Sequence, residues 1–222
     1  MNENQMKDLA KNQREETLSS IKQLDKNLWT IVYKSNYGLD KLLEKGCGNI
    51  MDAVLFLQKE VKFPSLTPNP EHSGFACSTF NAKNPGGQYL FGRNFDYKEA
   101  PCMVCWTAPE KGYRSVSVID TTFFIHGTKY HPLHKSEKML HTMGAPYMAM
   151  DGINEKGFSI GVLEIKSKAT KQNTGKKPII TTVAIRASLD KCETENEAMK
   201  LLSEVTLNYQ HEILKHQVIT LW

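Results

Sequence analysis

A cysteine, an arginine and an aspartate with the spacing of a reactive site lie near the middle of the sequence. Cys77 opens the motif CSTF, Arg93 follows sixteen positions later within GRNFD, and Asp96 follows three positions after that. A thiol is a nucleophile as its thiolate, and a nearby guanidinium favours that form. A carboxylate at Asp96 could hold a cationic partner. These side chains together predict nucleophilic catalysis by Cys77 with assistance from Arg93.

The cationic partner of Asp96 need not be a histidine. Cleavage of the chain before Cys77 would create a new α-amine with a pKa of about 8, and such an amine can act as the base for its own thiol. Small residues, Gly74 and Ala76, and a proline-rich stretch before them suit a cut here. The bond between Ala76 and Cys77 is therefore the candidate cleavage site.

Two short strands joined by a turn must position these residues. The segments 77–80 and 88–91 have the composition of strands, and the sequence NPGG at 84–87 between them is typical of a hairpin loop. Such a hairpin would place the strand that carries Arg93 beside the strand that begins at Cys77. The turn therefore explains how two residues sixteen positions apart could meet.

The rest of the chain shows a mixture of helical and strand patterns. Further strand-like runs lie at 28–33, 103–107, 115–119 and 158–163, and a second turn is expected at 150–157. Helical patterns lie at 40–46, at 50–61 after an Asn49 cap, at 179–189, and at 194–205, where Thr194 and Glu197 suggest a capping box. The first twenty-odd residues suit a helix or a disordered lead. We predict an α+β fold in which a helical N-terminal segment, 1–76, ends in a proline-rich linker and precedes a body at 77–222.

The composition is that of an ordinary globular protein of 222 residues, with 40% hydrophobic residues, 23% charged residues and a net charge of +4. The positive charge is spread along the chain, which argues against nucleic-acid binding. The N-terminus lacks the apolar core of a signal peptide, and no apolar run reaches membrane-spanning length, so we expect a cytoplasmic protein. Five cysteines, an odd number, favour reduced thiols over a disulfide framework.

Two other groups of potential ligands have simpler interpretations. Cys102 and Cys105 form CMVC, which could be half of a redox or zinc motif, but no second CxxC accompanies it. Strand packing explains this pair more simply. Four histidines are close in sequence but match no metal-binding spacing: His126, His131, His134 and His141. We therefore expect neither a metal nor a cofactor.

The motifs CSTF, FGRNFDY and DGINEKGFSIGVL resemble the choloylglycine hydrolase and acid ceramidase group of N-terminal nucleophile hydrolases. The resemblance extends from about residue 28 to about residue 202. It implies an αββα sandwich in which a cysteine exposed by processing attacks a linear amide bond. It also implies a small-molecule acyl amide as substrate: a fatty-acyl amide, a conjugated bile salt or a penicillin-like amide. The long segment before the cysteine slightly favours the first, and homo-oligomer formation stays open.

The resemblance assigns roles to individual positions. It implies that Cys77 is the nucleophile, that its freed amine is the base, that Arg93 assists the thiolate and substrate, and that Asp96 binds the α-amine. Asn154 matches the turn asparagine of the NEKG motif, a structural role more than a catalytic one. Arg186 matches an arginine that some members use near the site.

Two departures from the family pattern lead to a different expectation. Glu164 stands where relatives carry an asparagine that donates to the oxyanion. A carboxylate repels a developing oxyanion, and the loss of one donor typically costs about 3 kcal/mol. The sequence after the last predicted helix also lacks the strand and the second asparagine with which relatives continue. The alternative interpretation is therefore a truncated, catalytically impaired member that binds an acyl ligand or a partner.

Overall fold

The computed structural model describes residues 2–64, 76–96, 101–124, 140–164, 174–208 and 217–221. For Glu3, Phe123, Phe124, Glu164 and the segment 217–221 it describes the backbone alone. The proline-rich linker, three of the four histidines and most of the basic stretch at 166–177 lie outside the described residues.

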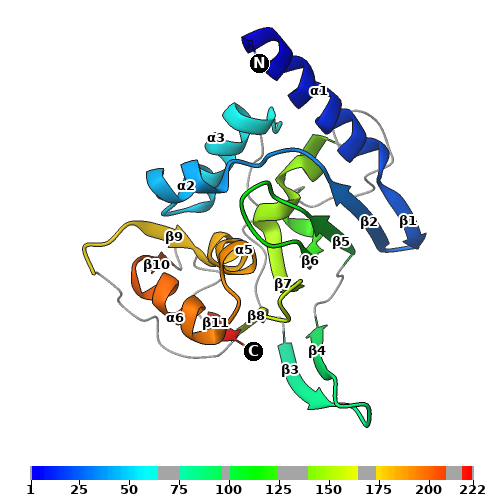
Figure 1. Ribbon diagram of the computed structural model, residues 1–222, viewed down its shortest axis with the longest axis vertical. Coiled ribbons are helices and arrows are strands. Elements are labelled where there is room, and N and C mark those ends of the chain that lie inside the picture. Colours follow the sequence, from blue (N-terminus) through cyan, green and yellow to red (C-terminus); the bar gives the residue numbers. More distant parts are fainter. Residues whose placement is uncertain are drawn as a thin grey trace.

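A seven-stranded sheet forms the centre of the molecule (Figure 1). In spatial order its strands are β1 (Lys22–Asp25), β2 (Leu28–Tyr33), β5 (Cys102–Thr107), β6 (Ser115–Asp120), β7 (Ala149–Asn154), β8 (Ser159–Glu164) and β11 (Gln217–Leu221). The β2 and β5 strands pair in parallel, and the other neighbours are antiparallel. Residues well before Cys77 thus contribute two strands to the same sheet as residues after it.

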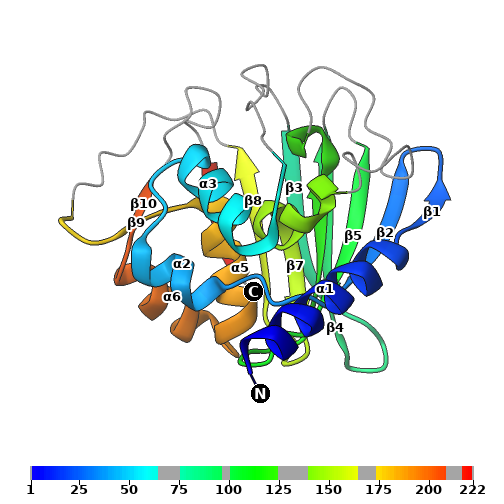
Figure 2. The same cartoon turned by 90° about the horizontal axis from the view of Figure 1, so that it is seen from above.

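The helices form a layer on one face of this sheet, while a separate hairpin lies on the other (Figures 1 and 2). The helical elements are α1 (Glu3–Ser19), α2 (Leu39–Lys45), α3 (Ile50–Val61), η1 (Thr121–Phe124), η2 (Thr142–Met148), α5 (Thr181–Lys191) and α6 (Glu195–Ser203). Two short strands, β9 (Pro178–Ile180) and β10 (Thr206–Asn208), pair in parallel beside them. The α5 helix contacts β7 and β8.

Capping residues and buried apolar side chains account for these helices. The Asn49 side chain accepts a hydrogen bond from the backbone of Asp52 and so begins α3. Thr194 caps α6 in the same way, but Glu197 accepts from the backbone of Glu193, so the reciprocal bond of the expected capping box is displaced by one residue. Trp29 of β2 is buried in the core between sheet and helices, where its burial stabilises the N-terminal strands.

The separate hairpin consists of β3 (Ala76–Lys83) and β4 (Tyr89–Asp96). Its turn closes where the backbone N–H of Gly87 donates to the Asn84 carbonyl at 2.9 Å, and Gly87 has a φ of +83°, which favours glycine. On the outer face, the Phe80 ring lies across Gly92, where a Cβ would come within 2.2 Å of the ring. Because Gly92 of the GRNFD motif has no side chain, it leaves room for the Phe80 ring.

The prediction of an α+β fold is confirmed, including the hairpin and the strand patterns on either side of it. The turn predicted at 150–157 is wrong in its first half, because Ala149–Asn154 forms the strand β7 and the reversal follows it. β1 was not predicted. None of the helices described here is both long and apolar enough to cross a membrane.

Candidate active site

Cys77 and Arg93 share the inner face of the hairpin, the face that meets the sheet. In the register of the two strands Cys77 is opposite Phe95, and Thr79 is opposite Arg93. Alternate residues of a strand point to the same side, so the arginine lies diagonally across from the cysteine. Its Nη2 donates to the Cys77 Sγ at 3.5 Å. The structure thus brings together the thiol and the guanidinium that the sequence pairs.

Arg93 is held between the hairpin and the sheet. Its Nη1 is ion-paired with the carboxylate of Asp151 on β7, and its Nη2 also donates to the carbonyl of Val162 on β8 at 2.6 Å. The guanidinium lies 5.0 Å from the centre of the Phe95 ring, a cation–π distance. The arginine side chain is 5% exposed. A buried guanidinium with this many partners has little freedom to move away from the thiol.

Asp151 is a member of the site that the sequence reasoning missed. Its side chain is 11% exposed. Burial raises the pKa of the Asp151 carboxyl, and the adjacent Arg93 guanidinium acts in the opposite direction. The sequence signal was present, since this aspartate opens the motif DGINEKG. Asp151 was assigned to a turn, where no contact with the Cys77–Arg93 hairpin would be expected.

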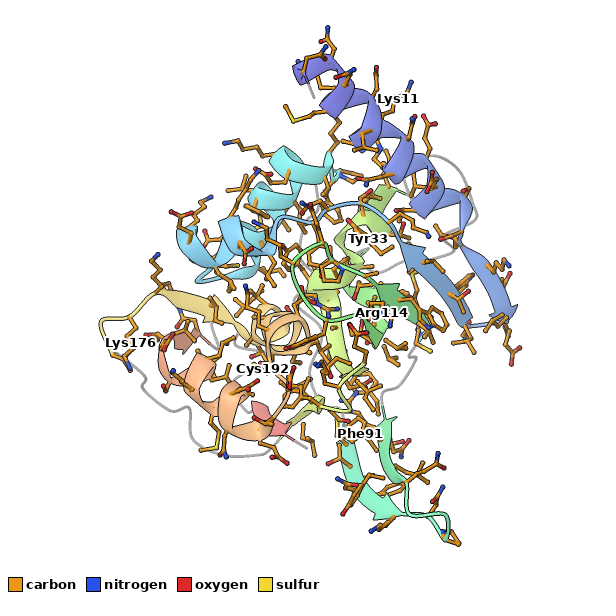
Figure 3. All side chains as sticks on the ribbon, viewed as in Figure 1. Lys11, Tyr33, Phe91, Arg114, Lys176 and Cys192 are labelled. Atoms are coloured by element: carbon orange, nitrogen blue, oxygen red, sulfur yellow. The ribbon has the colours of Figure 1, made fainter. Side chains whose placement is uncertain are left out.

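A cavity of about 290 Å³ lies beside the ion pair, between the hairpin and the sheet. Its lining is largely apolar with a few polar groups, a composition usual for small-molecule sites. The lining residues are Phe91 (labelled in Figure 3), Arg93, Phe95, Cys102, Val118, Asp120, Met150 and Asp151. A group that entered this cavity would lie next to the guanidinium that contacts the thiol.

Asp96 lies at the end of the hairpin where the candidate cleavage bond begins. It is exposed and is directly opposite Ala76 in the strand register. The amide of Asn94 donates to both of its carboxylate oxygens at 3.0 Å. Asp96 is therefore close to the peptide bond before Cys77, but among the described side chains its hydrogen bonds go to Asn94 and not to the thiol.

Asn154 acts as the structural centre of the turn after β7. Its Nδ2 donates to the carbonyls of Leu189 and Cys192 at 3.0 and 2.7 Å. Its Oδ1 accepts from the backbone N–H groups of Lys156 and Phe158 at 3.0 and 3.2 Å. All four hydrogen-bonding positions of the amide are thus used inside the protein, which leaves this side chain no group to offer a substrate.

Arg186 lies on the other side of the sheet. Its guanidinium is fully buried, is ion-paired with Asp190 at 2.7 Å and donates to the Ser115 Oγ at 2.5 Å. Ser115 and Val118 are three positions apart on β6 and so face opposite sides of the sheet, and Val118 lines the cavity. The structure therefore does not bring Arg186 to the thiol. Glu164 ends β8, and its side chain lies outside what the structure describes.

The CMVC motif does not form a paired thiol site. Cys102 and Cys105 are three positions apart on β5, so their side chains point to opposite faces of the sheet. Cys102 lines the cavity, whereas Cys105 is buried in the core beside the helices. All five cysteines are free thiols. This geometry agrees with the interpretation of the motif as strand packing.

Alkylation at pH 8 is expected to modify Cys77 before the other thiols. Burial raises the pKa of Cys47 and of Cys105 to about 12 and that of Cys192 to about 11, and it also raises the pKa of Cys102. Only a small fraction of Cys47, Cys105 or Cys192 is thiolate at pH 8, so we expect each of these three to react at least about tenfold more slowly than Cys77, and Cys102 to react more slowly as well. Peptide mass mapping during iodoacetamide treatment measures the order. Equally fast labelling of a buried cysteine would contradict this arrangement.

Comparisons with known proteins identify the family of this chain. A family model described as linear amide C–N hydrolases, choloylglycine hydrolase family, matches residues 77–221. Among solved structures, penicillin V acylase from Agrobacterium tumefaciens is similar, with 15% identity and a TM-score of 0.27, over 71% of this chain and 44% of that chain. The chain thus spans less than half the length of that enzyme. No curated protein gives a significant match. Because the family model begins at Cys77 and covers more than half of the sequence, the chain belongs to the choloylglycine hydrolase family of linear amide C–N hydrolases.

Proposed function

We propose that this protein hydrolyses linear amides with Cys77 as the nucleophile. The observation that carries the proposal is the contact of 3.5 Å between the Cys77 Sγ and the Arg93 Nη2, at the first residue that the family model matches. A guanidinium at this position favours the thiolate. The partly exposed setting of Cys77 also leaves the sulfur accessible to a substrate.

The reaction consists of two acyl transfers. The Cys77 thiolate attacks the amide carbonyl carbon, the C–N bond breaks, and the amine leaves with a proton from the catalytic acid. A thioester then joins the acyl group to Sγ. Water adds to the thioester and loses a proton to the same acid–base group, and the carboxylic acid and the Cys77 thiolate are released. We assign the acid–base role to the α-amine of Cys77 after cleavage of the bond that precedes it.

Asp96 would hold that α-amine. It is opposite Ala76 in the strand register, so its carboxylate is at the end of the hairpin where the new N-terminus would form. An ammonium ion beside a carboxylate is stabilised in its charged form. Asp96 would therefore stabilise the protonated α-amine, which is the form that gives a proton to the leaving amine of the substrate.

The cavity beside Arg93 supports an acyl group of moderate size. Its volume of about 290 Å³ is at the lower end of the range of small-molecule pockets, about 300–1,000 Å³, so a short or medium fatty-acyl chain or an arylacetyl group fits better than a steroid. Phe91, Phe95, Val118 and Met150 supply apolar walls. We propose such acyl amides as the substrates.

The first test of the proposal is cleavage between Ala76 and Cys77. We expect the purified chain to separate into residues 1–76 and a product that begins at Cys77, because the Cys77 sulfur attacks the Ala76 carbonyl, the bond to the Cys77 nitrogen breaks, and water then hydrolyses the thioester. Acid pH should speed the cut, because the departing amine takes up a proton. Intact-mass measurement detects both products. Cys77→Ala should stay uncut, whereas Cys192→Ala, which removes a thiol outside the site, should be cut like the wild type. Uncut chains in all three proteins, with masses that differ only by the substitution, would refute self-processing.

A further inference from the structure

We propose that Asp151 is a positioning residue that fixes Arg93 against the Cys77 thiol. The catalytic importance of the Cys77 thiolate rests on the proposed function, but the contacts that support this inference do not require that the chain hydrolyse an amide. One η nitrogen of Arg93 is ion-paired with Asp151 while the other donates to the Cys77 Sγ. The aspartate and the cysteine are thus joined through the two ends of one planar guanidinium.

The ion pair determines where the guanidinium can lie. The Arg93 and Asp151 side chains are 5% and 11% exposed. Each would have to move toward the surface before water could replace its partner. A guanidinium remains charged inside a protein, and a buried charge needs a counter-charge nearby. Asp151 provides it from the neighbouring sheet. The planar fork of arginine then directs the second η nitrogen to a defined side, where the thiol lies.

A β-bulge lies next to Asp151 in β7. Opposite β6, Asp151 pairs with Val118 and Ala149 pairs with Ile119, so Met150 is an additional residue in β7. From Asp151 to Asn154 the pairing with β6 is regular, and strand alternation places Asp151 on the face that meets the hairpin. The bulge turns Ala149 to the opposite face, so the alternation of the strand changes directly beside the carboxylate that contacts Arg93. Bulges of this kind are frequent next to active sites, where they redirect a side chain.

The glycine on the next strand completes this arrangement. Gly161 of β8 pairs with Asp151, and a Cβ at this position would be 3.7 Å from both the Cδ and the Nε of Arg93. A side chain larger than alanine would therefore occupy the path of the arginine across the sheet. The glycine thus leaves the guanidinium a direct route to the carboxylate.

Charge and position have opposite effects on the thiol, and this difference makes the proposal testable. The negative charge of Asp151 by itself disfavours a thiolate nearby, so its loss alone would speed alkylation of Cys77. Loss of the position of Arg93 would slow it, because the cation would leave the sulfur. The other described titratable groups near Asp151 are Cys102 on β5 and Asp120 on β6, which line the same cavity.

The experiment measures, across pH, the rate at which iodoacetamide alkylates Cys77. Each protein sample is first shown to have a single N-terminus, so that cut and uncut chains are not mixed. Arg93→Ala should slow the reaction about three- to tenfold, since a lower thiolate fraction is offset in part by higher intrinsic nucleophilicity. Asp151→Ala should slow it by a similar factor, and the double variant should be no slower than Arg93→Ala. Should the alanine variant fail to fold, Asp151→Ser carries the same expectation.

Asp190→Ala is the matched control. It also removes a buried aspartate that is paired with a buried arginine, but on the opposite face of the sheet. We expect it to lower stability without changing the alkylation profile of the folded protein. Faster or unchanged labelling in Asp151→Ala would overturn the positioning role. Because alkylation needs no substrate, slower labelling would support that role even if the chain hydrolysed no amide, and a failure of turnover would then count against the proposed function alone.

Discussion

Replacing Cys77 with alanine is expected to abolish amide hydrolysis. The substitution removes both the nucleophile and the site at which the new α-amine would form, so neither acyl transfer can proceed. Loss of the nucleophile in well-studied hydrolases lowers kcat by about 10⁶-fold, and we expect the activity of Cys77→Ala to fall to the background of the assay. A p-nitroanilide of a medium-chain or arylacetic acid provides the measurement.

Cys192→Ala is the control for this experiment. The Cys192 thiol is buried on the helix-covered side of the sheet, at the end of α5 (Figure 3). This variant should hydrolyse the same substrate at the wild-type rate, within the small effect of a core substitution. Equal activity of Cys77→Ala and the wild type would exclude Cys77 as the nucleophile. Absence of activity in every protein would favour a member that binds an acyl group without hydrolysing it.

Replacing Arg186 with alanine is expected to lower the free energy of unfolding by about 3–5 kcal/mol, because it leaves the buried Asp190 without its counter-charge. The guanidinium is fully buried and also bonds Ser115. Urea denaturation provides the measurement. The rate of Cys77 alkylation in the folded protein should not change, because this arginine lies across the sheet from the thiol. A slower rate at full stability would instead place Arg186 in the active site.

The stability loss should depend on pH. Burial raises the pKa of Asp190, and Arg186 opposes the shift, so its removal should raise that pKa further. A carboxyl with a raised pKa in the folded state contributes fully at acid pH, and the contribution is lost as pH rises through that pKa. The deficit should thus be smaller near pH 4 than near pH 7. The matched control is Arg114→Ala at the surface (Arg114 is labelled in Figure 3): because its pair with Glu155 is solvent-exposed, the loss of stability should be much smaller at either pH.

The local part of the site could be predicted from the sequence. The NPGG turn fixes the hairpin, and the strand alternation then places Cys77 and Arg93 on one face. Asn49 and Thr194 likewise predicted where their helices begin, because their side chains bond backbone groups three residues away. These features depend on neighbours in sequence, which a pattern records directly.

The long-range part could not be predicted. The bulge at Met150 depends on the register between β6 and β7, and no local pattern shows an unpaired residue inside an apolar strand, so Asp151 was assigned to a turn. The sequence predicted a helix at 179–189 but not which face of the sheet it covers, and the family resemblance alone associated Arg186 with the site. The parallel pairing of β2 with β5 joins segments about seventy residues apart, and the strand predicted at 28–33 was therefore expected to lie in a separate segment.

The central claim, that Cys77 carries the acyl group, is tested most directly by trapping the thioester. Processed protein is mixed with an acyl p-nitroanilide, quenched in acid within the first turnover and digested, and the peptides are analysed by mass spectrometry. We predict a mass increase equal to the acyl group on the peptide that begins at Cys77, and its loss on treatment with hydroxylamine. An acyl group found on another residue, or substrate turnover with no acylated peptide at any quench time, would contradict the assignment of Cys77 as the nucleophile.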